Sequence, residues 1–122
     1  MRNFRKYDVW ADGVDFSVYI YKITENFPKK ETYSLCDQMQ RAAVSIPSNI
    51  AEGCSRKSVN EFAHFLEFSL GSSYEVETQL EIAVRLGYVK KDDFEKAIGK
   101  VQSIEKRVTG LIQTIRPNSI NE

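Results

Sequence analysis

The stretch Arg41-Ala-Ala-Val-Ser-Ile-Pro-Ser-Asn-Ile-Ala-Glu-Gly-Cys-Ser-Arg56 has the periodicity of a helix but carries a proline near its centre. At 100° per residue, small and apolar residues from Leu35 to Gly53 share one face. A narrow polar stripe comprises Arg41, Ser45, Ser48, Asn49, Glu52 and Arg56. A third sector carries Val44, Pro47 and Ala51. More than half of the circumference is therefore apolar or small, and we expect a second surface, besides the core, to cover this helix.

Pro47 leaves two structures open for this stretch. It lacks the N–H that would bond to the Ala43 carbonyl, and its ring crowds that carbonyl. One possibility is a continuous helix that is kinked at Pro47, with the neighbouring serine and asparagine side chains satisfying the freed backbone groups locally. The other is a break, with a new helix beginning near Ile46 and Pro47 in its first turn.

Length and composition predict a single domain, 1–122. The 17 basic and 17 acidic residues cancel, so only local patches could attract nucleic acid. No apolar run reaches the ~18 residues of a membrane span, and no apolar segment follows the charged N-terminus, so we expect a cytoplasmic protein that does not bind a membrane. Cys36 and Cys54 would be about 27 Å apart in one helix. They cannot bridge each other, and we expect free thiols.

Hydrophobic periodicity predicts four helices, at about 7–26, 34–54, 59–86 and 92–116. Local boundary signals agree with these limits. Ser58-Val-Asn-Glu61 has the spacing of a capping box, Gly87 fits a left-handed helix end, and Pro117 should end the last helix. The short connections predict an all-α, antiparallel up-down four-helix bundle.

The first three predicted helices each carry a second apolar stripe, whereas the last has a single heptad seam from Phe94 to Ile115. Contiguous apolar patches on a surface usually mark interfaces. We therefore predict that the first three helices form an oligomer interface. Its residues are Trp10, Val14, Val18, Tyr21, Val44, Phe68, Ile82 and Leu86.

The sequence motifs give little indication of a catalytic or metal-binding site. Glu61 and His64 have the E-x-x-H spacing of bundle di-iron sites, but those sites need two such motifs and the chain has one histidine. No phosphate-binding glycine loop or nucleophile motif is present. We therefore expect no metal, no cofactor and no catalytic residue, and predict that the protein is not an enzyme. Glu75 lies within an apolar stripe, and we interpret it as a hydrogen-bond partner of a residue such as Arg41 or Gln79, inside the bundle or across an interface.

Two basic clusters are candidate nucleic-acid contacts. Lys96, Lys100 and Arg107 share the outer face of the last predicted helix, and Arg56 and Lys57 lie at a helix end. Solvated charge also explains each cluster taken singly. In a symmetric oligomer, however, every patch is repeated, and phosphate contacts add up across subunits.

The segment 41–53 is followed by Glu61-Phe62, Leu70-Gly71-Ser72, Glu75-Val-Glu-Thr-Gln-Leu80 and Arg85-Leu86-Gly87-Tyr88. Together these motifs resemble the bacterial 23S rRNA-intervening-sequence proteins, over nearly the whole chain and most weakly over the last helix. The resemblance implies a left-handed bundle that assembles into a ring-shaped homopentamer. It also implies a structural motif of Arg41, Ser45, Pro47, Asn49, Glu52, Gly53, Glu75 and Gln79.

The chain is also similar to the accessory variability protein of diversity-generating retroelements, a pentameric barrel that binds nucleic acid and a reverse transcriptase. Such accessory proteins are typically strongly basic, and this chain has no net charge. Our first hypothesis is a non-enzymatic oligomeric scaffold that contacts RNA, DNA or a nucleic-acid-processing enzyme. The alternative is a structural protein–protein interaction module with no nucleic-acid role.

Overall fold

A computed structural model describes residues 2–116 and contains four α-helices. They are α1 (Asp8–Thr24), α2 (Leu35–Cys54), α3 (Val59–Arg85) and α4 (Lys91–Ile115). Short 3-10 helices, η1 (Phe4–Lys6) and η2 (Lys29–Glu31), precede α1 and α2. Residues 2–116 contain no β-strand.

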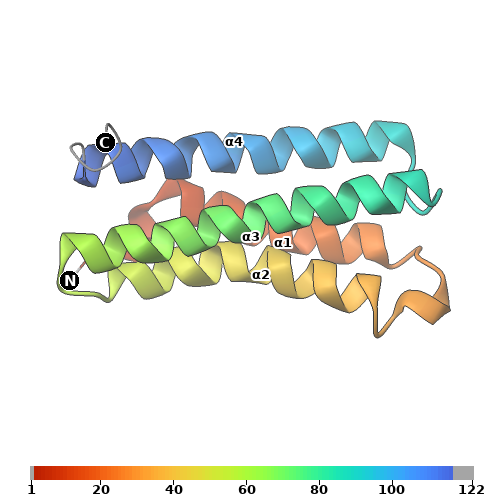
Figure 1. Cartoon of the computed structure of the whole chain (residues 1–122), viewed down its shortest axis with the longest axis horizontal. Coiled ribbons are helices and arrows are strands. Elements are labelled where there is room, and N and C mark those ends of the chain that lie inside the picture. Colours follow the sequence, from red (N-terminus) through yellow and green to blue (C-terminus); the bar gives the residue numbers. More distant parts are fainter. Residues whose placement is uncertain (1, 117–122) are drawn as a thin grey trace.

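The helices lie side by side along one axis, and the chain reverses direction at each connection (Figure 1). Helix α2 packs against both α1 and α3, and α4 packs against α3 and α1. The prediction of an all-α protein with four helices is confirmed. The left-handed twist of the bundle and its assembly into a homopentameric ring stay predictions.

The predicted helix boundaries are correct to within about two residues. The Ser58 hydroxyl accepts a hydrogen bond from the N–H of Glu61 at 3.0 Å, as expected for the start of α3. Gly87, with φ of 79°, follows the end of α3 in the left-handed conformation that glycine adopts without strain. Ser34 precedes α2, but its side chain makes no capping hydrogen bond. Pro117 lies outside the described residues.

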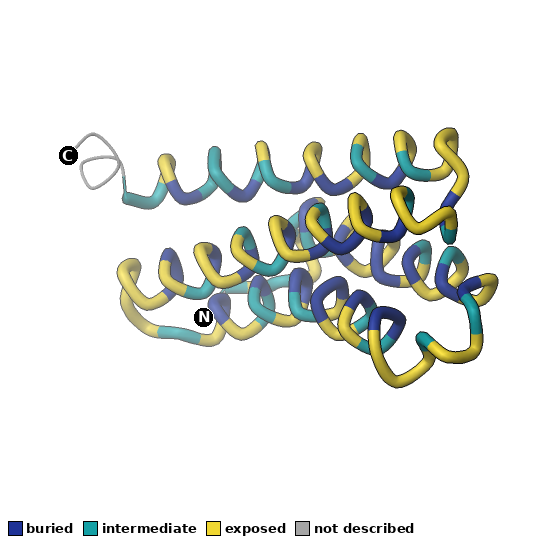
Figure 2. Tube along the Cα trace, turned by 45° about the vertical axis from the view of Figure 1, so that its right-hand side comes forward, coloured by how far each residue is buried: buried dark blue, intermediate teal, exposed yellow. Residues whose placement is uncertain are grey.

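Buried residues lie along the inward faces of all four helices (Figure 2). The predicted seam of α4 contributes Ala97, Val101, Ile104 and Val108, all buried. The largest fully buried residues of the other helices are Phe16, Ile20, Met39, Ile46, Ile50, Phe62, Leu66, Val76 and Leu80. Cys36 and Cys54 are free and buried, as predicted.

Helix α2 is continuous through Pro47. The carbonyl of Ala43, which loses its helical donor because of the proline, accepts a hydrogen bond from the Ser17 hydroxyl of α1 at 3.0 Å. The donor to this carbonyl therefore comes from another helix and not from Ser45, Ser48 or Asn49. Of the expected local bonds, Asn49 Nδ2 donates to the Ser45 carbonyl at 2.8 Å. Pro47 is buried against Gly13, where an added Cβ would lie 3.2 Å from the proline Cβ. Part of the second apolar sector of α2 is thus covered within the chain.

Small residues bring α2 and α3 close together. The hydroxyl oxygens of Ser45 and Ser72 lie 2.7 Å apart, and Ser69 donates to the Ile46 carbonyl at 2.9 Å. A Cβ on Gly53 would lie only 2.9 Å from the Cβ of Phe65. Because the two helices approach so closely, the polar face of α2 lies beside α3.

Among residues 2–116, no helix is both long enough and apolar enough to cross a bilayer.

Candidate interaction surfaces

An apolar groove between α1 and α2, hereafter the α1–α2 groove, brings together five of the predicted interface residues. Its volume is about 560 Å³. It is lined by Phe4, Arg5, Trp10, Val14, Ser17, Val18, Tyr21, Val44, Pro47, Ser48 and Ala51. The structure therefore brings Trp10, Val14, Val18, Tyr21 and Val44 to one surface, and its role as a subunit interface stays a prediction.

Trp10 and Arg5 form one end of this groove. The rings of Phe4 and Trp10 meet edge to face, with centroids 5.0 Å apart. The Arg5 guanidinium lies 5.4 Å from the centroid of the Trp10 ring, a distance at which cation–π attraction operates. The N-terminal η1 segment thus forms part of the groove, which the sequence analysis did not predict.

The remaining predicted interface residues, Phe68, Ile82 and Leu86, form a separate surface on α3, hereafter the α3 stripe. They are 52%, 45% and 54% exposed. Ten large hydrophobic residues are exposed among residues 2–116: four lie in the α1–α2 groove and three on the α3 stripe. Because this apolar surface is concentrated rather than scattered, it has the character of an interface.

Glu75 lies in the α3 stripe and is exposed. Arg41 forms an ion pair with Asp37, one turn earlier on α2, at 3.1 Å, so the predicted pairing of Glu75 with Arg41 does not form inside the chain. Gln79 is buried, and among the described residues no hydrogen bond joins its side-chain amide to the Glu75 carboxylate. A pairing of Glu75 across an interface stays a prediction.

Lys96, Lys100 and Arg107 line one groove between α1 and α4, as their shared face predicted. Two carboxylates, Asp12 and Asp15, line the same groove. Arg107 and Asp12 form an ion pair of 2.6 Å across it. The three cations are therefore opposed by two carboxylates from α1, which weakens this groove as a phosphate-binding surface.

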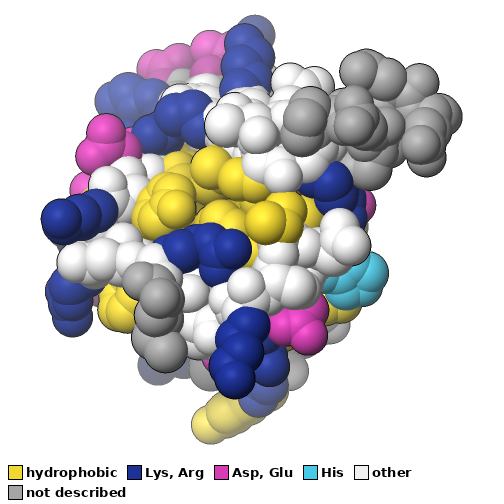
Figure 3. All heavy atoms as spheres, turned by 90° about the vertical axis from the view of Figure 1, so that its left-hand side faces the viewer, with side chains coloured by type: hydrophobic (Ala, Val, Ile, Leu, Met, Phe, Trp, Pro, Cys, Tyr) yellow, Lys and Arg dark blue, Asp and Glu magenta, His cyan; other side chains and the backbone are white. Residues whose placement is uncertain are grey.

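The second predicted basic pair, Arg56 and Lys57, is joined by cations of the N-terminal segment. Arg2 donates to the Arg56 carbonyl at 2.7 Å, and its guanidinium lies 4.3 Å from the centroid of the Phe62 ring. Five cations of the N-terminal segment and the α2–α3 connection lie at this end of the bundle, hereafter the basic end: Arg2, Arg5, Lys6, Arg56 and Lys57. Arg116, which follows α4 at the same end, pairs with Glu67 at 3.0 Å. In Figure 3, which views the molecule from this end, Lys and Arg side chains surround a central group of hydrophobic side chains.

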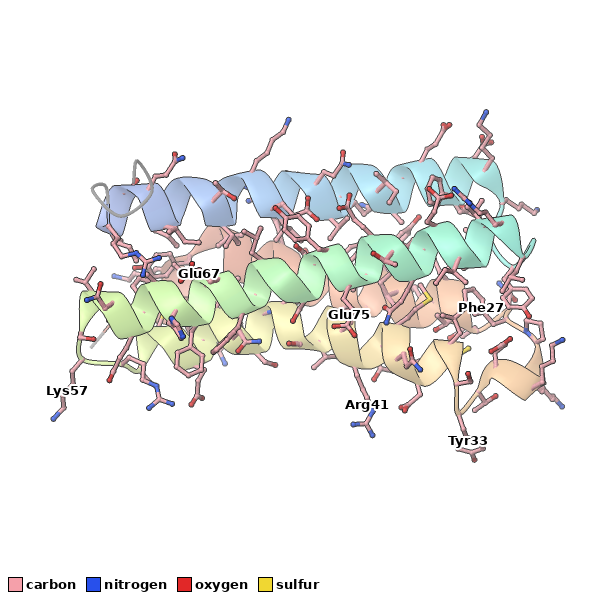
Figure 4. The ribbon with its side chains drawn as sticks, in the orientation of Figure 1. Phe27, Tyr33, Arg41, Lys57, Glu67 and Glu75 are labelled. Carbon is pink, nitrogen blue, oxygen red and sulfur yellow. The ribbon has the colours of Figure 1, made fainter. Side chains whose placement is uncertain are left out.

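Only some of the cations at the basic end form ion pairs. Arg56 bonds to Glu52 at 2.7 Å and lies 4.7 Å from the centroid of the Phe65 ring, so both its charge and its planar face are engaged. Lys57 is exposed and points away from the bundle (Figure 4). Arg2, Arg5 and Lys6 were not among the predicted contacts, although the sequence begins with a charged segment.

A pair of carboxylates, Glu77 and Glu105, lies between α3 and α4. Burial, and then the negative charge of Glu77, raise the pKa of Glu105 to about 7. The side-chain amide of Gln102 donates to Glu77 at 2.9 Å. Glu105 itself buries one carboxylate oxygen without a hydrogen-bond partner in the described part of the chain. Periodicity could not reveal this pair, because it depends on the register between two helices.

Other titratable groups offer no assembled site. His64 is exposed and lies 3.8 Å from Glu67, so it faces solvent as expected from its place on the helical wheel. Residues 2–116 contain no group of three His, Cys, Asp or Glu side chains that could hold a metal ion. Burial raises the pKa of both the Cys36 and the Cys54 thiol, which reduces their thiolate fraction and their reactivity.

Comparison with known proteins agrees with the resemblance seen in the sequence. The family model of 23S rRNA-intervening sequence proteins matches residues 5–110. A crystal structure of a protein of unknown function, from the S23 ribosomal protein family of Bacteroides thetaiotaomicron, is similar with a TM-score of 0.78 and 26% sequence identity. The similarity covers 86% of this chain and 98% of that chain. No curated protein matches the chain.

Proposed function

Because this chain belongs to the 23S rRNA-intervening sequence protein family, we propose that it acts as a non-enzymatic scaffold that assembles from several identical copies. The observation that carries the proposal is the α1–α2 groove, which is largely apolar, has a volume of about 560 Å³ and is left uncovered by residues 2–116. The specific assembly we propose is the homopentameric ring that the family resemblance implies. A cytoplasmic location is part of the same proposal.

The distribution of apolar surface supports self-association. Val14, Val18, Tyr21 and Val44 are between 37% and 49% exposed and face a common groove, so a partner would bury all four at once. Helix α4, by contrast, buries its single seam inside the bundle. Among the described residues, nine of the ten exposed large hydrophobic side chains thus lie on α1, α2 and α3 or directly after α3, and Tyr33 is the exception. A subunit interface on the first three helices fits this distribution.

We also propose that the protein has no catalytic activity. The strongly perturbed carboxylate, Glu105, has Glu77 beside it in the seam between α3 and α4. A shifted pKa marks a candidate catalytic group only when a partner and a substrate pocket accompany it. Burial, together with a second acid at the same seam, explains the raised pKa of Glu105 without catalysis.

Light scattering of the purified protein tests self-association. The wild type should have a mass several times the chain mass of 14.0 kDa, and five times that mass if the ring forms. Val18→Asp places a charge in the α1–α2 groove and should reduce the mass toward that of one chain. Tyr33→Asp is the matched control, because Tyr33 is 94% exposed and lies outside the groove. A monomeric wild type at tens of micromolar would refute the proposal.

Contact with nucleic acid is a second candidate function, and the basic end favours it. Five cations gather there, and a ring would repeat this end once per copy. Log affinity for RNA or DNA should then fall linearly with log salt concentration. Lys6→Ala with Lys57→Ala should weaken binding and reduce the salt slope by about one unit per lost phosphate contact.

The opposite end of the bundle supplies the control for this test. Lys29 and Lys30 are exposed on η2, far from the basic end (Figure 1). Lys29→Ala with Lys30→Ala removes the same charge and should leave the affinity unchanged. Equal losses from both double variants would contradict a localised site. An assembled protein that binds neither RNA nor DNA would favour the alternative, a scaffold for a protein partner.

A further inference from the structure

We propose that the α1–α2 groove of one copy receives the α3 stripe of the next copy, so that assembly is head to tail. The inference rests on the proposed self-association and specifies which surfaces meet. It commits to one occupant of the groove, a second copy of this chain, and to one segment of that copy, the exposed face of α3.

The two apolar surfaces differ in shape. The α1–α2 groove is concave and is lined by side chains from α1, α2 and the η1 segment. The α3 stripe comes from a single helix, where Phe68, Ile82 and Leu86 are each about half exposed. An isologous contact between two grooves or two stripes would leave the other apolar surface uncovered. A head-to-tail contact uses both surfaces in every copy and closes into a ring when its rotation divides a full turn.

Charge complementarity supports the same pairing. Glu75 stands within the α3 stripe, and the structure gives it no partner within residues 2–116. Arg41 lies on α2, three residues before Val44 of the groove. Asp37 accepts only from Nε of Arg41, at 3.1 and 3.2 Å, which leaves the terminal amino groups of Arg41 available.

Figure 4 adds the relative position of the two charged groups. Glu75 and Arg41 lie at about the same level along the bundle, near its middle, and Arg41 points away from the helices. Two copies related by rotation about an axis parallel to the bundle keep these levels matched. The contact would therefore bring Glu75 of one copy to Arg41 of its neighbour. A carboxylate drawn into an apolar contact without a cation would instead oppose association.

Two blocked variants test which surfaces meet. Val18→Asp blocks the groove and leaves the α3 stripe intact, whereas Ile82→Asp blocks the stripe and leaves the groove intact. Both residues are exposed, so neither substitution disturbs the core. Each variant alone should be monomeric, and an equimolar mixture should form a heterodimer of twice the 14.0 kDa chain mass. An isologous groove interface would instead leave Ile82→Asp fully assembled by itself.

Charge reversal tests the Glu75–Arg41 contact. Glu75→Lys and Arg41→Glu should each weaken association by about tenfold or more, as measured for close charge pairs at interfaces. Mixing the two single variants should restore association in part, because contacts between unlike chains pair opposite charges while a ring of five keeps one contact between like chains. The double variant Glu75→Lys with Arg41→Glu restores a pair of opposite charges at every contact. A pairing inside one chain would be rescued only in the double variant and not by mixing. Thermal unfolding of each variant verifies that it is folded.

The outcomes separate this inference from the proposed function. A monomeric wild type refutes the proposed self-association. An assembled wild type whose blocked variants do not complement each other overturns the head-to-tail contact alone. Complementation without a charge-reversal effect also overturns the proposal, in its assignment of Glu75 to Arg41.

Discussion

Replacing Glu105 by glutamine should stabilise the bundle at pH 8 relative to the wild type, and more so than at pH 5. The pKa of Glu105 is raised from 4.5 to about 7 by burial and by the charge of Glu77. Below pH 4.5 the carboxyl group is neutral in both the folded and the unfolded chain. As the pH rises through 7, the unfolded chain has already released the proton that the folded chain holds, so the folded state loses stability.

The size of the effect follows from the pKa. The full shift corresponds to about 3 kcal/mol, at about 1.4 kcal/mol per pKa unit. Glu105 is only partly buried, so solvent screening reduces this to roughly 1–2 kcal/mol. Part of that loss is already present at pH 5 because the unfolded carboxyl titrates near 4.5. Between pH 5 and pH 8 the advantage of Glu105→Gln over the wild type should therefore grow by roughly 1 kcal/mol.

Urea unfolding followed by circular dichroism, at one protein concentration and at both pH values, measures this difference. Glu77→Gln should also flatten the pH dependence, because it removes the neighbouring charge that raises the pKa of Glu105. Glu95→Gln is the control, since Glu95 is exposed on the same helix. Its effect should stay within about 0.5 kcal/mol at both pH values. An advantage of Glu105→Gln that does not change between pH 5 and pH 8 would refute the reasoning.

Gly53→Ala should lower the free energy of unfolding by about 1–3 kcal/mol, because the added Cβ would overlap α3. Gly99→Ala is the control, because its Cβ would meet nothing within 4 Å, and it should be neutral or stabilising. Urea titrations measure both changes. Ser17→Ala removes the donor to the Ala43 carbonyl and should destabilise by about 1–2 kcal/mol. In a Pro47→Ala background its effect should be smaller, as a double-mutant cycle would measure. The two buried thiols should react with a thiol reagent at pH 8 far more slowly in the folded protein than in urea.

Three results would contradict these predictions. Equal stability changes for Gly53→Ala and Gly99→Ala would mean that α2 and α3 are not in close contact at Gly53. An unchanged effect of Ser17→Ala in the Pro47→Ala background would show that the hydroxyl does not substitute for the missing N–H. Thiol labelling at the same rate in the folded and the unfolded chain would place the cysteines at the surface.

Local patterns were sufficient to predict the helices, their ends and most of the core. The Ser58 cap and the left-handed Gly87 depend on a few adjacent residues, and the α4 seam follows from its heptad spacing. The binding surfaces inferred only from clusters of charged residues were less well predicted. Arg107 is paired with Asp12 of another helix, which no periodicity within α4 could indicate.

The sequence by itself determined that the chain is a four-helix protein of a recognisable family with more apolar surface than its own core uses, because helix periodicity and helix ends are local properties. Tertiary structure decided which of those apolar residues remain exposed. Pro47 turned out to be buried against Gly13 at the base of the α1–α2 groove, while Val44, one turn away, is 40% exposed in it. It also determined that the Ser17 hydroxyl donates a hydrogen bond to the Ala43 carbonyl and that the Glu105 carboxyl group lies beside that of Glu77. These contacts depend on which helices are neighbours and on their register, and a residue's spacing along its own helix specifies neither.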